Sequence, residues 1–315
     1  MSQETIHIPA ALFEELWPLS HVKVGLILQQ REDRLACALL ADEGRFIYKI
    51  VNQARSDSQV LQDTSAFGLL RRRGLCHLPV LLKTRADENY TKIQERFVYI
   101  MHFVEGENKS RSPRKWAQLA EIAADLHEIT DYPYASPMTI ESEFAKAELN
   151  STRSPFAREV SEVIDQLPRF EGLSQSVIHA DLNLENAILT PNNELVLVDW
   201  EDAGVGPTVL DLGYPLLRYF VCTEDMEFER GRARAFFGTY FEKRSLPELD
   251  KSLIFDAGLL NLLGTCRYGD SPRTWRHILY ALKNRELVTS VLNEQKPDPR
   301  FEEDFVELVA PEDAP

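Results

Sequence analysis

The sequence predicts an α+β protein of two lobes, a small β-rich lobe first and a larger helical lobe after it. Short apolar and β-branched runs, separated by turn signals, fill the first hundred residues. After Gly106, apolar residues recur at helical spacing. The length of 315 residues exceeds what one modest domain needs. We therefore expect an N-lobe over residues 1–105, a C-lobe over 106–293 and an acidic tail over 294–315.

The predicted N-lobe consists of five strands and one helix. The strands are short apolar runs, expected over 22–29, 34–40, 46–51, 79–83 and 97–103. Asp42, Glu43 and Gly44 form a turn signal between the second and third of them. The helix is expected over 58–73, and Gly74 marks its end, because glycine readily takes the left-handed conformation that follows a helix.

The predicted C-lobe is mainly helical. One buried helix face is expected from residues at helical spacing, which are Trp116, Leu119, Ala120, Ala123 and His127. We interpret His127 as a packed core histidine. Residues 131–155 are rich in Pro, Ser and acidic side chains, and an irregular connection is expected there. Further helices are expected over 156–167 and after Val209, with short apolar runs at 177–178 and 195–198 between them.

Composition excludes several classes of function. The 35 basic and 50 acidic residues give a formal charge of −15, which argues against nucleic acid and an anionic membrane surface as partners. The four cysteines, Cys37, Cys76, Cys222 and Cys266, form no C-x-x-C pair, so a thiolate zinc site is not expected. No apolar run reaches membrane-spanning length, and the first residues lack a secretory pattern. A cytoplasmic protein is therefore expected.

One stretch carries a pattern of chemically active side chains. It reads His179-x-Asp181-x-x-x-x-Asn186, followed by an apolar strand that ends at Asp199. Phosphoryl transfer needs a carboxylate to orient the attacking hydroxyl and oxygen ligands to hold magnesium against the phosphates. Asp181 suits the first task, and Asn186 and Asp199 suit the second. The spacing also matches a kinase catalytic loop.

Residues 177–212 resemble the aminoglycoside phosphotransferase and choline kinase-like family, the small-molecule branch of the protein-kinase-like fold. The resemblance implies that Asp181 is the catalytic aspartate and that Asn186 and Asp199 are the metal ligands. ATP or GTP and Mg²⁺ are the cofactors that it implies. The specific part of the resemblance is this one segment, and a looser likeness extends from about residue 20 to 290.

The resemblance also assigns supporting roles to His179 and Asp211, which brace the catalytic loop. Two details favour a small-molecule kinase over a protein kinase. Asn183 stands where protein kinases usually have a lysine that meets the transferred phosphate. Only 211 − 199 = 12 residues separate Asp199 from Asp211, which leaves no room for a regulated activation loop.

The first lobe carries candidate nucleotide-binding residues. Lys49 lies near the end of an apolar strand, where it could pair with the α- and β-phosphates. Its expected acidic partner on the next helix is Asp63. Asp63 is one methylene shorter than the family's glutamate, so the pair is expected within direct reach or bridged by one water. The first hairpin, near residues 29–33, contains no glycine, unlike the phosphate-covering loop of protein kinases. Within it Glu32 would sit badly beside phosphates.

The stretch from 97 to 106, FVYIMHFVEG, resembles the strand and hinge between the two lobes of a kinase. Backbone groups near His102 and Val104 are expected to meet the purine edge, and Met101 is a candidate wall of that pocket. A simple core strand accounts for the same residues.

The acceptor is expected to bind against the C-terminal helices. Acidic side chains such as Glu201, Asp202, Glu224 and Asp225 favour an amine-bearing alcohol, whereas arginines at 267, 273 and 276 favour a carboxylate. Both interpretations stay open, and the sequence gives no oligomeric state. The function predicted is phosphoryl transfer from ATP or GTP to a small hydroxyl acceptor. The alternatives are a nucleotide-binding protein of this fold with little activity and a protein Ser/Thr kinase.

Overall fold

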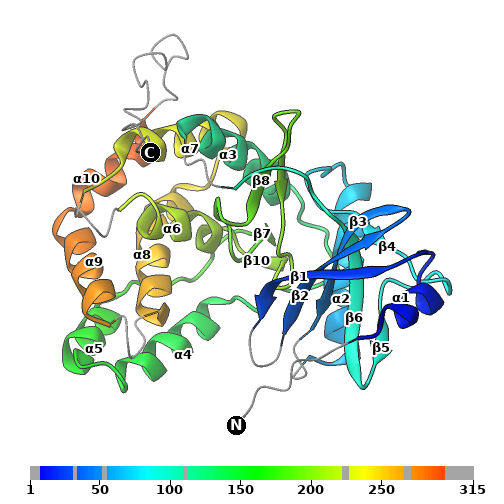
Figure 1. Cartoon of the computed structure of the whole chain (residues 1–315). Helices are drawn as coiled ribbons and strands as arrows, with labels where there is room; N and C mark the ends of the chain where they lie inside the picture. The colour runs from blue at the N-terminus through cyan, green and yellow to red at the C-terminus, as the bar shows by residue number, and fades with distance from the viewer. Residues whose placement is uncertain are drawn as a thin grey trace, which may run out of the picture. The chain divides into compact units, whose positions relative to one another are not determined.

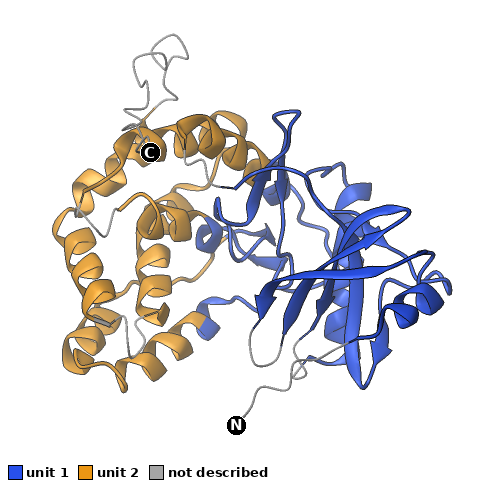
Figure 2. Cartoon of the chain, in the orientation of Figure 1, with its two compact units in different colours: residues 1–110, 125–142, 174–211 blue, residues 111–124, 143–173, 212–315 orange. Residues whose placement is uncertain are grey.

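The computed structural model describes residues 8–30, 34–51, 55–108, 112–221, 227–265 and 271–294. The chain divides into two compact units, coloured separately in Figure 2. Unit 1 contains residues 1–110, 125–142 and 174–211, and unit 2 contains 111–124, 143–173 and 212–315. These units group the catalytic-loop segment with the first 110 residues. The predicted boundaries after residues 105 and 293 stay predictions.

Unit 1 is rich in strands (Figure 1). Its first elements are α1 (Ala10–Leu16), β1 (Lys23–Gln30), β2 (Leu35–Ala41), β3 (Gly44–Ile50), α2 (Asp57–Arg72), β4 (Leu81–Leu82), β5 (Thr91–Ile93) and β6 (Arg96–His102). Its later strands are β7 (Gln175–Ile178), β8 (Ala187–Leu189), β9 (Leu195–Leu197) and β10 (Gly204–Pro207).

The main sheet has the order β1-β2-β3-β6-β4, and β5 pairs with β6. All of these pairings are antiparallel. In the register of β3 against β6, Lys49 lies opposite Tyr99 and Ile47 opposite Met101. Strand β3 therefore places Lys49 in the middle of the sheet, between β2 and β6.

Side chains of alternating residues place two separate cores on the two faces of this sheet. On one face Phe46, Tyr48 and Ile50 of β3 pack with Phe13 and Trp17, at the end of α1. On the opposite face a second cluster joins Val60 of α2 to the odd-numbered residues of β6, which are Phe97, Tyr99 and Met101. Because residues of a strand alternate between faces, Lys49 points to the α2 face of the sheet.

Two small two-stranded sheets follow in the same unit. Strand β7 pairs with β10, and β8 pairs with β9. The segment after β6 runs beside β8, where Glu107 and Leu189 exchange two backbone hydrogen bonds of 3.0 and 2.8 Å. Gly106 permits this approach, because a Cβ at that position would lie 2.2 Å from the Leu189 carbonyl oxygen and its φ is +152°. The segment at Gly106 and Glu107, predicted as the hinge, is thus joined to β8, the strand after the predicted catalytic loop.

Unit 2 is helical (Figure 1). It contains α4 (Ile140–Ser151), most of which lies in this unit, α5 (Ala157–Gln166), α7 (Arg230–Lys243), α8 (Glu248–Thr265), α9 (Ser271–Lys283), α10 (Arg285–Ser290) and the 3₁₀ turn η1 (Val291–Asn293). Helices α3 (Pro113–His127) and α6 (Thr208–Arg218) contribute residues to both units. Helices α6 and α8 approach closely at Gly213 and Gly258, where an added Cβ would meet backbone atoms at 2.3–2.4 Å.

Most predicted elements are confirmed to within a few residues, but the irregular connection over 131–155 is wrong. Helix α4 occupies half of it. The helix begins at a reciprocal cap, in which Thr139 Oγ1 accepts from the Ser142 N–H and Ser142 Oγ from the Thr139 N–H, at 3.1 and 2.9 Å. Its buried residues include the polar Glu143 and Asn150, so the apolar periodicity of a helix is weak.

Four short elements have no counterpart in the prediction, namely α1, β5, β8 and β10. Among the described residues, no helix combines the length and the apolar character needed to cross a membrane.

Candidate active site

The loop after β7 begins with a strained backbone. Ala180 has a φ of +69°, in the left-handed region that costs a non-glycine residue roughly 1–2 kcal/mol. The buried Asp211 carboxylate accepts hydrogen bonds from the N–H groups of His179 and Ala180, at 2.6 and 2.8 Å. His127 Nε2 lies 3.2 Å from the same carboxylate. Asp211 therefore fixes the start of this loop, and His127 has a polar partner as well as a packed position.

Asp181 follows directly and is held by two asparagines. The Nδ2 group of Asn183 donates to Asp181 Oδ1, and that of Asn186 donates to Asp181 Oδ2, each at 2.8 Å. The side-chain Oδ1 of Asn183 also accepts from the backbone N–H of Asn186 at 2.9 Å. These bonds fix both oxygens of the Asp181 carboxylate, which suits a group that must orient a substrate hydroxyl.

The same loop is tied to the strand that leads to Asp199. His179 Nε2 lies 3.0 Å from the Val198 carbonyl oxygen, and the Val198 N–H donates to the Asn186 carbonyl oxygen at 2.7 Å. Pairing of β8 with β9 continues this contact along the chain. The structure therefore brings Asp181, Asn186 and Asp199 into one arrangement within unit 1.

Asp199 itself takes a left-handed conformation, with a φ of +68°. Aspartate tolerates this region better than most residues, yet such a conformation persists only where its surroundings hold it. Lys49 Nζ donates to Asp199 Oδ1 at 2.7 Å and to Glu201 Oε1 at 3.0 Å. Burial works to raise the pKa of the Asp199 carboxyl, but the Lys49 ammonium holds that pKa below its usual value. Asp199 is therefore ionised at neutral pH.

Lys49 stays charged because of the same ion pairs. Burial works to lower the pKa of its ammonium, but the carboxylates of Glu201 and Asp199 help to raise that pKa above its usual value. Only 14% of the Lys49 side chain is exposed, so these two charge pairs are weakly screened. A fixed positive charge at this position suits contact with phosphate oxygens.

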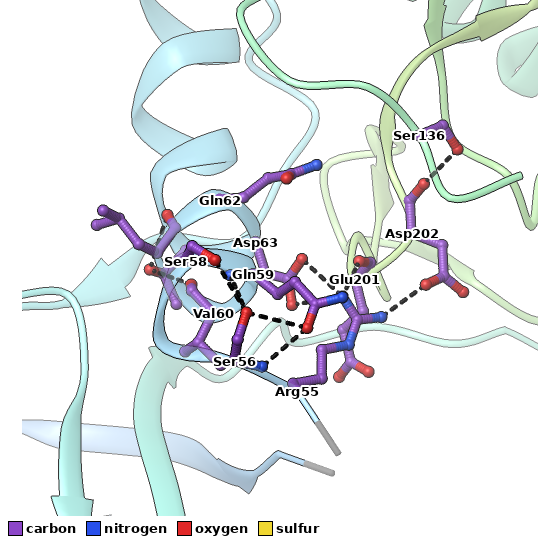
Figure 3. A network of polar contacts seen from close by, with 12 residues as sticks. Arg55, Ser56, Ser58, Gln59, Val60, Gln62, Asp63, Ser136, Glu201 and Asp202 are labelled. Atoms are coloured by element: carbon purple, nitrogen blue, oxygen red, sulfur yellow. Dashed lines mark hydrogen bonds and ion pairs between the residues drawn. The ribbon is translucent and has the colours of Figure 1, made fainter. Parts of the chain in front are cut away.

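Lys49 and Asp63 form no direct ion pair among the described residues, and the longer or water-bridged pair stays a prediction. Arg55, directly before α2, takes up Asp63, donating from Nη1 to both carboxylate oxygens at 2.9 Å (Figure 3). Lys49 instead reaches Asp199 and Glu201, because the segment after Asp199 brings two carboxylates within range of one ammonium group. Asp63 lies on α2 near this network without an ion pair to Lys49 among the described residues.

The hinge residues occupy the last part of β6 and the segment after it. Met101 is buried on the α2 face of the sheet. The N–H groups of His102 and Phe103 donate to the carbonyl oxygens of Val80 and Arg45, at 2.8 and 2.9 Å. Among the described residues, Val104, which follows Phe103, has no backbone–backbone hydrogen bond.

Several predicted features lie outside the described residues. They are the centre of the first hairpin at 31–33, Glu224 and Asp225, Arg267, and the tail from residue 295 onward. Arg273 and Arg276 are described and exposed on α9.

The oxygen groups at the site fit a hard divalent cation. Asp199 is ionised, and the Nδ2 group of Asn186 is turned to Asp181, which leaves the Asn186 Oδ1 as a candidate ligand. Carboxylate and amide oxygens are ligands that Mg²⁺ prefers, and it usually takes only one or two from the protein. Asn186 and Asp199 are therefore the candidate protein ligands of a Mg²⁺ ion, and phosphate and water would fill its other positions.

Comparison with known proteins identifies the family. Residues 27–249 match the family described as "Phosphotransferase enzyme family" (APH), which is well over half of the chain. The chain belongs to this family. An uncharacterized protein of Deinococcus radiodurans is 25% identical over 170 residues, a match that covers 48% of each chain. The match thus spans about half the length of that curated relative.

Solved structures of small-molecule kinases share the fold of this phosphotransferase-family protein. An aminoglycoside phosphotransferase from Alicyclobacillus acidocaldarius is 16% identical, with a TM-score of 0.61, over 92% of this chain and 96% of the other. A microcompartment-associated aminopropanol kinase is 16% identical, with a TM-score of 0.65, over 90% and 97%. Amicoumacin kinase, in complex with AMP-PNP and Ca²⁺, is 15% identical, with a TM-score of 0.62, over 89% and 92%. The predicted resemblance and the α+β kinase-like fold class are confirmed.

Two residues of the site, Asn183 and Arg55, have no role predicted from the sequence, and Glu201 has one only as part of an acidic field for the acceptor. Glu201 shares Lys49 with Asp199, and its place two residues after Asp199 is the signal that could have found it. Asn183 holds Asp181, although the sequence marks it only as a departure from protein kinases. Arg55 has no sequence signal, because its partners lie 8, 146 and 147 residues away.

Proposed function

We propose that this protein transfers the γ-phosphoryl group of ATP or GTP to a hydroxyl group of a small molecule, with Mg²⁺ as cofactor. The observation that supports this most directly is the hydrogen-bonded arrangement within unit 1. It joins the Asp181 carboxylate to Asn186, Asn186 to the strand before Asp199, and Asp199 to Lys49. The family match and the kinase-like fold support the same reaction class.

Asp181 is the base in this proposal. Its carboxylate, held by Asn183 and Asn186, accepts a hydrogen bond from the acceptor hydroxyl and takes its proton as the oxygen attacks. The O–H bond of the acceptor breaks, a bond forms between that oxygen and the γ-phosphorus, and the bond to the bridging β–γ oxygen breaks. The products are the phosphorylated acceptor and the nucleoside diphosphate.

Asn186 and Asp199 hold the metal in this proposal. Bound Mg²⁺ would neutralise charge on the β- and γ-phosphate oxygens, which is the main demand of phosphoryl transfer. Lys49 contributes a second positive charge at the α- and β-phosphates. Its present partners, Asp199 and Glu201, keep the ammonium ionised and pointed to this region until nucleotide binds.

The purine is proposed to bind along the hinge. Met101 lines one wall, and backbone groups of His102 and Val104 meet the edge of the base. The N–H of His102 donates to Val80, so in this proposal the carbonyl oxygen of His102 and the backbone of Val104 are the groups that meet the base. His179 and Asp211 act only through the loop, by holding its backbone.

The acceptor is proposed to be an amine-bearing alcohol. The formal charge of −15 favours a cation. Glu201 and Asp202 add less to this field than the sequence suggests, because they pair with Lys49 and Arg55. The aminopropanol kinase that shares the fold acts, by its name, on such a compound. The exposed arginines Arg273 and Arg276 favour a carboxylate instead, and a homoserine-like acceptor would use them.

A phosphate-transfer assay with labelled ATP or GTP and Mg²⁺ tests this function. The acceptor panel contains choline, ethanolamine, aminopropanol, aminoglycosides, fructosamines and homoserine, and each is assayed with and without a chelator. Magnesium-dependent transfer to an amine-bearing alcohol is the expected result. A clear preference for homoserine or an anionic sugar contradicts the cationic acceptor, and no nucleotide binding at all contradicts the proposed reaction.

A further inference from the structure

The side chain of Arg55 lies at the centre of an ion-pair network in unit 1 (Figure 3). Its backbone directly precedes Ser56, the N-cap of α2. Ser56 and Gln59 form a reciprocal capping box, with the Gln59 N–H bonded to Ser56 Oγ at 3.3 Å and the Ser56 N–H to Gln59 Oε1 at 2.8 Å. The cap fixes the point from which the arginine side chain extends.

The guanidinium joins α2 to the segment that follows Asp199. Nη1 donates to the Asp63 carboxylate and also to the Glu201 carbonyl oxygen, at 2.9 Å in each case. Nη2 donates to Asp202 Oδ1 at 2.6 Å. A guanidinium can bind these groups at once because its donors lie in one rigid plane, which a lysine cannot reproduce.

Removal of Arg55 would leave negative charges in this network without their positive partner. Only 6% of the Asp63 side chain is exposed, and Glu201 and Asp202 lie close to it. Burial is the main cause that raises the pKa of Asp63, to about 7, and the two nearby carboxylates add to it, while Arg55 opposes the rise. Without the guanidinium, mutual repulsion would push the Glu201–Asp202 segment away from α2.

The segment from 199 to 202 is held from a second side. Ser136 Oγ donates to the Asp202 carbonyl oxygen at 2.7 Å. Ala135 and Val205 form a parallel bridge beside it, and Gly204 allows this approach because an added Cβ would lie 2.5 Å from the Ser136 nitrogen. Arg55 and Ser136 thus hold the residues directly after the left-handed Asp199, which needs such support.

We propose that Arg55 is a positioning residue for the nucleotide and metal site, and that it sets the placement of Asp199 and Glu201 opposite Lys49 by fastening residues 201–202 to helix α2. This inference rests on the proposed function of that site. Among the described residues, Arg55 contacts protein carboxylates and one carbonyl oxygen, so it acts through them. Small displacements of a group that holds phosphate or metal have large effects on binding and rate.

The test compares Arg55→Gln and Arg55→Lys with a matched arginine variant, Arg73→Gln. Arg73 stands at the other end of α2 and pairs with Asp131, so Arg73→Gln removes the same kind of side chain and a more exposed ion pair far along the same helix. Asp202→Asn weakens the same contact from its acidic side. This variant is expected to fold, because 54% of the Asp202 side chain is exposed. Calorimetry measures the affinity of each full-length protein for AMP-PNP, with and without Mg²⁺.

In the expected result, Arg55→Gln weakens the Mg²⁺-dependent affinity for AMP-PNP about tenfold, the size of one lost charge-assisted contact. Arg55→Lys keeps only part of the wild-type affinity for AMP-PNP, and Arg73→Gln keeps all of it. Asp202→Asn weakens affinity in the same direction, and the double variant Arg55→Gln/Asp202→Asn loses less than the sum of the two, because both changes remove one contact. In the transfer assay KM for the nucleotide rises more than kcat falls.

Equal AMP-PNP affinities for wild type, Arg55→Gln and Asp202→Asn, with only a lower unfolding temperature, would show a purely structural arginine and overturn the inference. Strictly additive losses in the double variant would also overturn it. If Arg55→Gln does not fold, Asp202→Asn decides between the same outcomes. A wild-type protein that binds no Mg-nucleotide overturns the proposed function as well, so failure of the two proposals is distinguishable.

Discussion

The pH dependence of stability should report on one buried histidine of unit 2. His277, on α9, is 1% exposed, and its Nε2 atom has no hydrogen-bond partner among the residues that the structure describes. Burial is the main cause that lowers the pKa of His277 to about 4, with help from Arg218 and Arg273, although a hydrogen bond to the Leu217 carbonyl opposes it. In the unfolded chain the pKa returns to about 6.5.

The sign of the effect follows from these two values. Between pH 6.5 and 4 the unfolded chain binds a proton at His277 that the folded protein does not, so stability falls as the pH falls through this window. Between pH 7 and pH 4.5 the loss from this one group is about 2 kcal/mol. The full contribution is present above the unfolded pKa.

Urea unfolding of wild type and His277→Asn at pH 7 and pH 4.5 measures this loss. Asparagine was chosen because its amide can replace the ring donor to the Leu217 carbonyl. The variant is expected to be less stable at pH 7, because it leaves a small cavity, but its free energy of unfolding should fall by about 2 kcal/mol less between the two pH values. All other groups titrate equally in both proteins. Parallel pH profiles would refute the argument.

Two further predictions concern the proposed site. Asp199→Ala and Asn186→Ala should each weaken Mg-nucleotide binding tenfold or more, so that a stabilisation of about 2.7 kcal/mol at 100 times the wild-type Kd falls to about 1.4 kcal/mol or less. Thermal unfolding with and without Mg-AMP-PNP measures this stabilisation. A chelator should abolish the difference between wild type and the two variants. If both variants keep the full wild-type shift, Asp199 and Asn186 are excluded as metal ligands. Asp211→Asn should lower the free energy of unfolding by about 3 kcal/mol. The carboxylate of Asp211 accepts from two backbone N–H groups, and the asparagine amide would turn its own N–H donor toward one of them. Urea unfolding measures that loss, with Asp165→Asn on the exposed side of α5 as control, and equal stability of the two variants would show that Asp211 does not hold the loop.

Local patterns account for how much of the fold could be predicted. Strands β2, β3 and β6 are apolar runs bounded by turn signals, and α2 begins at a capping box and ends before Gly74. Short strands such as β8 and β10 carry too few residues for a periodic pattern, since tertiary pairing alone defines them. Helix α4 was missed because its buried face is partly polar.

In the site, too, a local motif identifies some residues, whereas contacts between residues far apart in the sequence were not predicted. The catalytic-loop residues Asp181 and Asn186 lie five positions apart, so one motif identifies both, and Asp199 follows on the next strand. The partner of Lys49 could not be found this way, because Asp199 and Glu201 lie 150 and 152 residues from it. The choice between Asp63 and these carboxylates depends on Arg55, whose contacts arise only in the folded chain.

The central claim is that Asp181 acts as the base in phosphoryl transfer, and the rate of Asp181→Asn tests it most directly. The assay is magnesium-dependent transfer to the best acceptor of the panel, with AMP-PNP affinity measured in parallel and Asp165→Asn as the matched control. The account predicts that kcat of Asp181→Asn falls by about 100-fold or more, as expected for loss of a general base, with little change in AMP-PNP affinity. An Asp181→Asn protein that retains the wild-type kcat would contradict it.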